Sequence, residues 1–159
     1  MFVSIGSNID RERNVASGIE LLRVRYGELQ LSPVYETRAV GFDGENFYNL
    51  VAAFTTDEAV ETINDALHRI EDACGRVRSG PRFSSRTLDI DLLLYDDEVR
   101  ETDALTLPRR EITEQAFVLK PLADIAGERR HPVLGRTYNE LWKSFDHNES
   151  DLHEVPFPF

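Results

Sequence analysis

Cysteine is nearly absent from this sequence, since only Cys74 occurs among its 159 residues. One thiol excludes an internal disulfide framework and a zinc site built from cysteines. Long apolar runs are missing too, and the three leucines at 92–94 are far too short a run to cross a bilayer. The first residues lack the basic stretch, the apolar segment and the cleavage site of a secretory signal. We therefore expect a cytoplasmic protein that does not associate with membranes.

Lysine is scarce as well: only two of the 18 basic residues are lysines, and 29 acidic residues bring the net charge to −11. This charge argues against nonspecific binding of nucleic acid. The arginines gather in one stretch, at positions Arg69, Arg76, Arg78, Arg82 and Arg86. Because guanidinium groups grip phosphate oxygens in pairs, the cluster indicates a phosphate-bearing ligand. A solvated surface, paired with the acids at 71 and 72, is the alternative explanation of the same charges.

The hydrophobic pattern predicts one domain over residues 1–145, followed by a tail over 146–159 that is disordered or docked. Strands are expected over residues 2–5, 29–37, 47–56 and 87–95, with a short return strand over 98–101. Helices are expected over 11–25, capped by Asn8 or Asp10, between Asp57 and Gly75, over 112–126 with a disturbance at Pro121, and from 138. Loops are expected over 38–45, 76–85 and 105–110. The order β-α-β-β-α-β indicates an α+β, ferredoxin-like core with a mainly antiparallel sheet, and the later helices would complete a three-layer α-β-α arrangement.

The most informative motif is the pair Asp89 and Asp91 within the apolar segment 87–95. Residues two apart on a strand project to the same face, so both carboxylates point together, roughly 7 Å apart at their roots. Unpaired, they would repel each other and lose solvation, so their place in this apolar strand suggests a partner, such as a cation that both carboxylates hold. Mg²⁺ prefers a few carboxylates plus phosphate oxygens and water, and together with the arginines this predicts phosphoryl-type transfer from a nucleotide. A solvent-exposed strand face with alternating polar residues is the alternative.

Several ordered segments carry a resemblance to a known family: 4–8, 32–37, 47–49, 75–78, 82–91, 105–108 and 116–122. In them the sequence resembles the 6-hydroxymethyl-7,8-dihydropterin pyrophosphokinase family of folate biosynthesis. The resemblance implies transfer of pyrophosphate from ATP to the hydroxymethyl group of the pterin, which gives the pterin diphosphate and AMP. It also implies two Mg²⁺ ions as cofactors, with ATP and the pterin as small-molecule partners. We expect a monomer.

The resemblance also implies a role for individual residues. Asp89 and Asp91 would hold the two Mg²⁺ ions. Phosphates and nucleotide would be contacted by Arg76, Arg78, Arg82, Arg86, His68, Glu71, Leu105 and Thr106, with Arg76 and Arg86 on a loop that closes over the reaction. The pterin would be contacted by Thr37, Val40, Phe47, Asn49, Phe83 and Phe117, with Asn49 bonding its edge and Phe117 stacking on its ring.

The sequence departs from the family pattern at a few positions. Arg109 stands where the family usually has a histidine, and Arg109 with Arg110 can supply a charge for the nucleotide there. Gln115 stands in place of the usual arginine and cannot act as a cation. A proline usual in the pterin loop is Ala39 here. The Gln115 departure keeps open a ferredoxin-like module that binds pterin or nucleotide without turnover. A metal-dependent phosphohydrolase that uses the same two aspartates is a further alternative.

Overall fold

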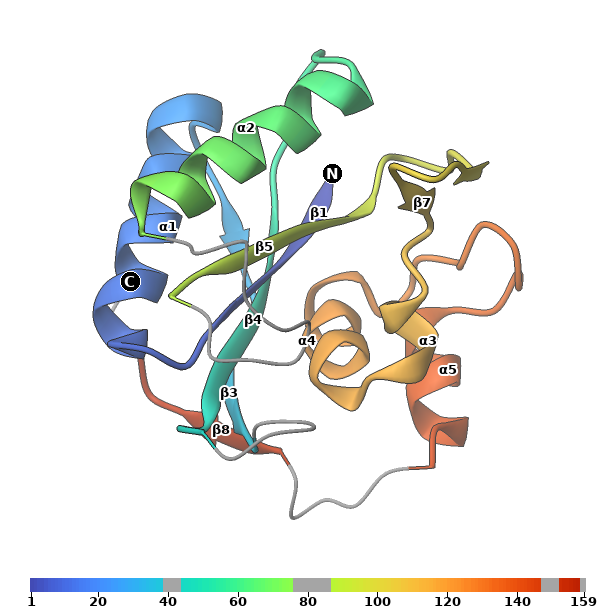
Figure 1. Cartoon of the computed structure of the whole chain (residues 1–159). Helices are drawn as coiled ribbons and strands as arrows, with labels where there is room; N and C mark the ends of the chain where they lie inside the picture. Colours follow the sequence, from blue (N-terminus) through green and yellow to red (C-terminus); the bar gives the residue numbers. More distant parts are fainter. Residues whose placement is uncertain (39–43, 76–86, 147–151, 158–159) are drawn as a thin grey trace.

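An antiparallel sheet forms the centre of the computed structural model, which describes residues 1–38, 44–75, 87–146 and 152–157 (Figure 1). Its strands run in the order β5-β1-β4-β3-β8, and β2 pairs with β4 beside this path. Their bounds are β1 Phe2–Ser7, β2 Gln30–Leu31, β3 Val34–Thr37, β4 Phe47–Ala53, β5 Asp89–Leu94 and β8 His153–Val155. The order of β5, β1, β4 and β3, together with the connecting helices, confirms the ferredoxin-like topology expected from the sequence.

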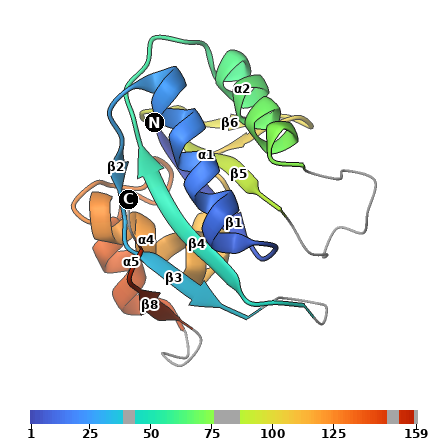
Figure 2. The same ribbon diagram turned by 90° about the vertical axis from the view of Figure 1, so that its left-hand side faces the viewer.

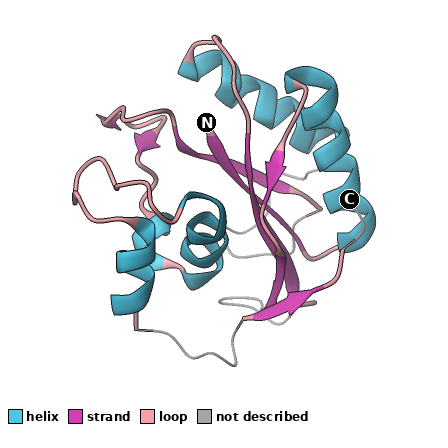
Figure 3. Ribbon diagram, turned by 180° about the vertical axis from the view of Figure 1, so that it is seen from behind, coloured by secondary structure: helices cyan, strands magenta, loops and turns pink. Residues whose placement is uncertain are grey.

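Helices cover both faces of the sheet, which makes three layers (Figures 1 and 2). On one face lie α1 Arg11–Tyr26 and α2 Val60–Ala73. On the other lie α3 Glu111–Glu114, α4 Ala116–Ala126 and α5 Tyr138–Ser144, which Figure 3 shows from behind. Within the described part of the chain, no helix is long and apolar enough to cross a membrane.

Strand alternation divides the buried side chains between two cores, one on each face of the sheet. On β5, Ile90 and Leu92 belong to the core beneath α1 and α2, while Leu93 belongs to the core beneath α4. On β4, Leu50 and Val51 divide in the same way. Neighbouring residues of a strand point to opposite faces, so a strand covered on both sides is apolar at nearly every position. The polar positions of β4 and β5 are therefore informative.

Helix α2 begins later than the sequence predicted. Its N-cap is Ala59 in an extended conformation, so the prediction that Asp57 caps it is wrong. The preceding segment is instead held at Glu58, whose carbonyl accepts a hydrogen bond from the Tyr95 hydroxyl at 2.8 Å and whose carboxylate pairs with Arg25 at 2.5 Å. Asp10 does occupy the N-cap position of α1, but with φ 41 and without a side-chain capping bond. The positive φ is the reason, because it replaces the usual extended cap geometry.

The predicted helix over 112–126 is two helices, and the break is at Gln115 rather than at Pro121. Gln115 is extended, with φ −125 and ψ 121, and ends α3 while starting α4. Its carbonyl accepts the N–H groups of Val118 and Leu119, which opens α4. Pro121 is accommodated within α4. A break was expected at Pro121 because proline lacks an N–H, but the observed break lies six residues earlier, at Gln115.

Two further strands form a small hairpin outside the main sheet. The predicted return strand appears as β6 Arg100–Glu101, which pairs with β7 Thr106–Leu107 inside the segment expected to be a loop. The tail contributes β8, which pairs antiparallel with β3. Beyond it, the ring of Phe157 packs edge-on against Tyr48, with the ring centroids 6.2 Å apart. The described part of the tail is thus docked.

Candidate active site

The two aspartates of β5 lie on the face of the sheet that α4 covers. Asp89 and Asp91 are half-buried and alternate with the buried Ile90 and Leu92, which enter the opposite core. The shared face is the arrangement that the spacing of two residues predicted. In the register of the sheet, Asp91 lies opposite Ser4 and Asp89 opposite Gly6 on β1.

Negative charge is concentrated around Asp91. The pKa of Asp91 is raised, first by burial and then by the charge of Asp89, with smaller contributions from Glu71 and Glu111. The guanidinium of Arg109 opposes this rise, since it lies 3.4 Å from Asp91 Oδ1 and 2.6 Å from Glu111 Oε2. Adjacent carboxylates that keep each other from ionising are stabilised by a cation. The electrostatics of the face therefore favour a further positive charge.

Oxygen ligands of this kind suit a hard divalent cation such as Mg²⁺. Among the described residues, no three His, Cys, Asp or Glu side chains come together as a metal site. A cation between Asp89 and Asp91 would accordingly need ligands beyond the His, Cys, Asp and Glu side chains of the described residues. Mg²⁺ commonly takes one or two carboxylates and completes its shell with phosphate oxygens and water. The donor set fits a metal that arrives with a nucleotide.

Asn49 lies on the same face, in line with Asp89. Gly6 of β1 lies between them, because it is opposite Asp89 on one side and opposite Asn49 of β4 on the other. Strands are about 4.8 Å apart, so Asp89 and Asn49 are separated by roughly 10 Å. The Asn49 Nδ2 group donates a hydrogen bond of 2.8 Å to Thr37 Oγ1, and both side chains are buried. This bond fixes the orientation of the amide.

Gly6 places no side chain on the sheet face between these two polar residues. A Cβ atom at this position would lie 3.0 Å from Asn49 Oδ1 and 3.9 Å from Phe47 Cδ1. A glycine within a strand often marks a place where another molecule approaches the backbone closely. Phe47 precedes Asn49 by two residues and shares its face, and Phe117, in the first turn of α4, is partly buried against the second core. Phe47 is therefore next to the polar row, and Phe117 lies on the same side of the sheet.

The residues predicted to contact the nucleotide are divided between two places. Leu105 is buried and Thr106 half-buried at the β6–β7 hairpin, and Arg109 follows it. The Arg109 N–H donates a 3.0 Å hydrogen bond to the carbonyl of Leu93, so this segment is tied to β5. Arg110, by contrast, is exposed and pairs with Glu101 at 2.6 Å. The structure therefore brings Arg109, but not the Arg110 side chain, to the aspartates.

The predicted residues of α2 differ from each other. His68 is exposed, whereas Glu71 is only 2% exposed and its Oε2 accepts a hydrogen bond of 2.9 Å from the N–H of Ile90. The sequence did not predict this hydrogen bond between Glu71 and β5. The position of Glu71 directly after Ile70, on the apolar stripe of the helix, was the signal that could have indicated it. Glu111 was missed altogether, because nothing in the local sequence shows that it will meet Arg109.

The remaining predicted residues lie outside the described part of the chain: Val40, Arg76, Arg78, Arg82, Phe83 and Arg86. Gln115, at the break between α3 and α4, is half-buried.

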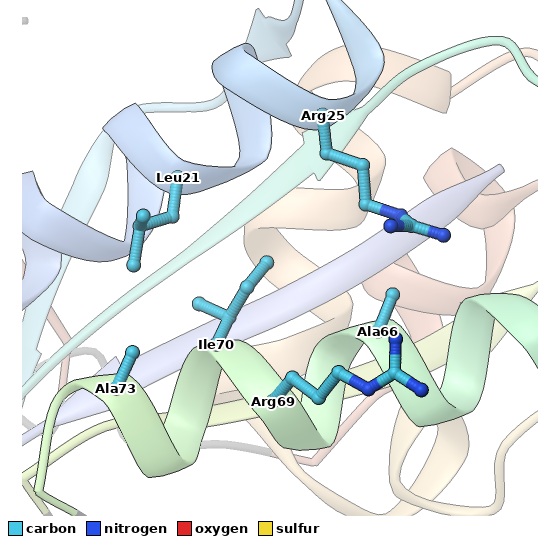
Figure 4. Close-up of a pocket in the computed structure, with 6 residues that line it drawn as sticks. All are labelled: Leu21, Arg25, Ala66, Arg69, Ile70 and Ala73. Carbon is cyan, nitrogen blue, oxygen red and sulfur yellow. The ribbon is translucent and has the colours of Figure 1, made fainter.

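A separate hollow of about 220 Å³ lies between α1 and α2. Figure 4 shows its lining, which is Leu21, Arg25, Ala66, Arg69, Ile70 and Ala73. Both helices cover the face of the sheet opposite to the aspartates, so this hollow is not part of the site described above.

Known proteins with similar sequences are enzymes of folate synthesis. The model of the 7,8-dihydro-6-hydroxymethylpterin-pyrophosphokinase (HPPK) family matches residues 2–127. A 2-amino-4-hydroxy-6-hydroxymethyldihydropteridine pyrophosphokinase of Pseudomonas aeruginosa is 37% identical over 145 residues, which cover 89% of this chain and 88% of the relative. The folic acid synthesis protein fol1 of Pneumocystis carinii is 32% identical over 155 residues, which cover 93% of this chain and 20% of that protein.

Solved structures resemble the chain in fold. A crystal structure of HPPK-DHPS in complex with substrates superposes with a TM-score of 0.71 at 12% sequence identity, covering 91% of this chain and 43% of that one. The HPPK-DHPS of Plasmodium falciparum, crystallised with SDX-DHP, gives a TM-score of 0.69 at 15% identity, covering 91% of this chain and 43% of that one. The chain thus spans about a fifth of the fungal relative and less than half of the HPPK-DHPS chains.

Proposed function

This chain belongs to the 7,8-dihydro-6-hydroxymethylpterin-pyrophosphokinase family, a class of ATP-dependent pyrophosphokinases of folate biosynthesis, and we propose that it transfers the pyrophosphoryl group of ATP to the hydroxymethyl group of 6-hydroxymethyl-7,8-dihydropterin. One observation carries the proposal: Asp89 and Asp91 share a sheet face with Asn49, and Gly6 between them adds no side chain to that face. The products would be the pterin diphosphate and AMP.

Asp89 and Asp91 are the residues that would hold Mg²⁺, as two ions on the family's pattern. Their carboxylate oxygens support this assignment, as does the raised pKa of Asp91, which is caused first by burial and then by the charge of Asp89. When bound, the ions supply neutralisation of phosphate charge and orientation of the phosphates.

The pterin would lie on the same sheet face, next to Asn49. Because Asn49 Nδ2 already donates to Thr37, its Oδ1 is the atom left to accept an N–H of the pterin edge. Phe117 would stack on the ring, and Phe47 would border it. Gly6 would allow the ring to approach the backbone of β1.

The phosphates would be met by cationic side chains. Arg109, beside Asp91, is assigned to this role, together with the arginines of the stretch outside the described residues, Arg76, Arg78, Arg82 and Arg86. In the reaction, the pterin hydroxyl oxygen attacks the β-phosphorus in line. The bond from that phosphorus to the oxygen of the α-phosphate breaks, AMP leaves with the electron pair, and the hydroxyl proton passes to solvent.

The test is direct detection of products. Purified protein is incubated with ATP and the hydroxymethyl-dihydropterin, with and without Mg²⁺, and pterin diphosphate and AMP are measured by mass spectrometry. Asp89→Ala should reduce transfer by at least ~1000-fold, because positioning and charge stabilisation at the phosphates provide most of this catalysis. Asp97→Ala is the matched control, since Asp97 lies in the turn after the same strand and its side chain is 84% exposed.

Near-normal transfer by Asp89→Ala would exclude the metal role of the pair. Binding of both substrates without AMP release would instead identify a binding module. This alternative rests on Gln115, which stands in place of a cationic residue. Phosphate release from ATP without pterin would identify a hydrolase. The monomeric state stays a prediction, and light scattering measures it.

A further inference from the structure

Glu71 is an acidic side chain in an apolar setting. It lies on the face of α2 that packs on the sheet, beside Leu67 and Ile70, and only 2% of it is exposed. Removing a carboxylate from water is unfavourable unless hydrogen bonds replace the lost solvation. Its place in the fold therefore requires a specific partner.

One such partner is the backbone of β5. Glu71 Oε2 accepts the N–H of Ile90 at 2.9 Å, across 19 positions of the chain. Figures 1 and 2 show α2 running alongside β5. β5 is the first strand in the sheet order and pairs only with β1 among the described strands. The N–H of Ile90 points away from β1, toward the side of β5 where no described strand pairs with it, and the Glu71 carboxylate is the acceptor there.

Ile90 is the residue between the two aspartates. Along a strand, successive N–H groups point to opposite edges, so an outward N–H at Ile90 places those of Asp89 and Asp91 toward β1. β5 is consequently held from both edges at the point where its carboxylates leave the backbone. A group that fixes the backbone on which ligand-bearing residues sit controls their orientation.

We infer that Glu71 is a positioning residue: by accepting the Ile90 N–H it fixes the segment that carries Asp89 and Asp91. The effect of Glu71 on catalysis rests on the function proposed above. The hydrogen bond from Ile90 to Glu71 is independent of that function. The resemblance placed Glu71 beside the nucleotide. The geometry points to a further role, in which one carboxylate oxygen, Oε2, faces the strand. Its charge also adds to the negative field at Asp91, which favours a cation there.

Two substitutions separate these contributions. Glu71→Gln keeps an oxygen that can accept the Ile90 N–H but removes the charge. Glu71→Met keeps the length and removes the acceptor. Asp65→Ala is the control, because Asp65 is an exposed acid on the same helix. Thermal unfolding of each protein establishes that the fold is retained.

The first readout is hydrogen exchange of the Ile90 amide by NMR in the protein without ligands. We expect strong protection in the wild type, exchange within about threefold of it in Glu71→Gln, and exchange faster by about 10-fold or more in Glu71→Met, as the loss of a hydrogen bond to a charged group implies. An unprotected Ile90 amide in the wild type would overturn the inference without any variant. Equal exchange in Glu71→Met and the wild type would overturn it as well.

The second readout is Mg²⁺-dependent transfer. Glu71→Met should lower kcat by about 10-fold or more and leave the KM for pterin within about twofold, because the Asn49 side of the site does not touch this edge. Glu71→Gln should restore most of kcat. A faster-exchanging Ile90 with an unchanged kcat would refute the link between the strand and catalysis. If the wild type makes no product at all, the proposed function fails, and the exchange measurement still decides the role of Glu71.

Discussion

Gly6 gives the sharpest test of where the pterin lies. Replacing it by alanine would place a methyl group 3.0 Å from Asn49 Oδ1, 3.8 Å from the carbonyl oxygen of Tyr48 and 3.9 Å from Phe47 Cδ1. The backbone oxygen and the aromatic ring are at ordinary contact distances, but the amide oxygen is not. The Asn49 side chain must therefore shift by a few tenths of an ångström. Its 2.8 Å hydrogen bond to Thr37 Oγ1 would be distorted as a result.

The size of the effect follows from two contributions. Weakening the hydrogen bond that orients a buried amide costs about 1 kcal/mol, which is roughly fivefold in affinity. A methyl group under the bound ring adds an overpacking penalty of about 1 kcal/mol or more. We therefore expect the KM for the pterin to rise between about fivefold and about fiftyfold in Gly6→Ala. The KM for ATP should stay within about twofold, because no phosphate-binding residue is displaced.

Steady-state kinetics with each substrate varied in turn measures both constants. Gly18→Ala is the control, since its Cβ would lie 2.9 Å from Leu88 Cδ2, on the opposite side of the sheet. That variant should lose about 1–3 kcal/mol of stability by overpacking and keep its pterin KM. An unchanged pterin KM in a folded Gly6→Ala protein would refute the placement of the pterin. An equal rise in both KM values would show that the substitution acts on the whole site.

Two predictions concern stability. Deleting residues 147–159 removes β8 and the contact of Phe157 with Tyr48, so the free energy of unfolding should fall by about 1–2 kcal/mol in urea titrations, and an unchanged midpoint would contradict this. Burial lowers the pKa of His131, whose Nδ1 accepts the N–H groups of Val133 and Leu134, at 3.2 and 3.1 Å. As the pH falls through about 6.5, the unfolded chain binds a proton at His131 before the folded one does, so the fold loses stability, up to about 1.4 kcal/mol per pH unit. His131→Asn keeps an acceptor without titrating, and should lose less stability than the wild type between about pH 7.5 and about pH 5.5; equal losses would contradict the assignment.

The parts of the fold that depend on local pattern could be predicted from the sequence. The alternation of Asp89, Ile90, Asp91 and Leu92 gave the correct division between the two faces of β5, because a strand has a fixed period of two. The spacing of the apolar residues likewise predicted α1 and α2 as helices. The order of elements then indicated the ferredoxin-like topology.

The errors arise where distant residues decide the local structure. Asp57 is a good N-cap in isolation, but Glu58 is held by Arg25 and by the Tyr95 hydroxyl, so α2 begins only at Val60. These partners lie more than thirty positions away, and no local signal reveals them. The break at Gln115 has the same character, since propensity alone favoured a break at the proline.

The site itself combines both kinds of information. That Asp89 and Asp91 share one face follows from their spacing of two residues on a strand, whereas the link from Asp89 through Gly6 to Asn49 exists only because β1 lies between β5 and β4. The same is true of Glu71, whose partner at Ile90 becomes accessible because β5 is the edge strand. Each residue in this row sits on a regular strand or helix and not on a loop, and rigid elements hold functional groups more closely than loops do. The distance between the backbones that carry the Asp89 carboxylate and the Asn49 amide is then set by strand spacing, at roughly 10 Å across two strand intervals. A substrate that meets Asn49 at one end and presents its reactive hydroxyl to the aspartates at the other must match that fixed length, so shortening or lengthening the arm that carries the hydroxyl should reduce kcat more than binding.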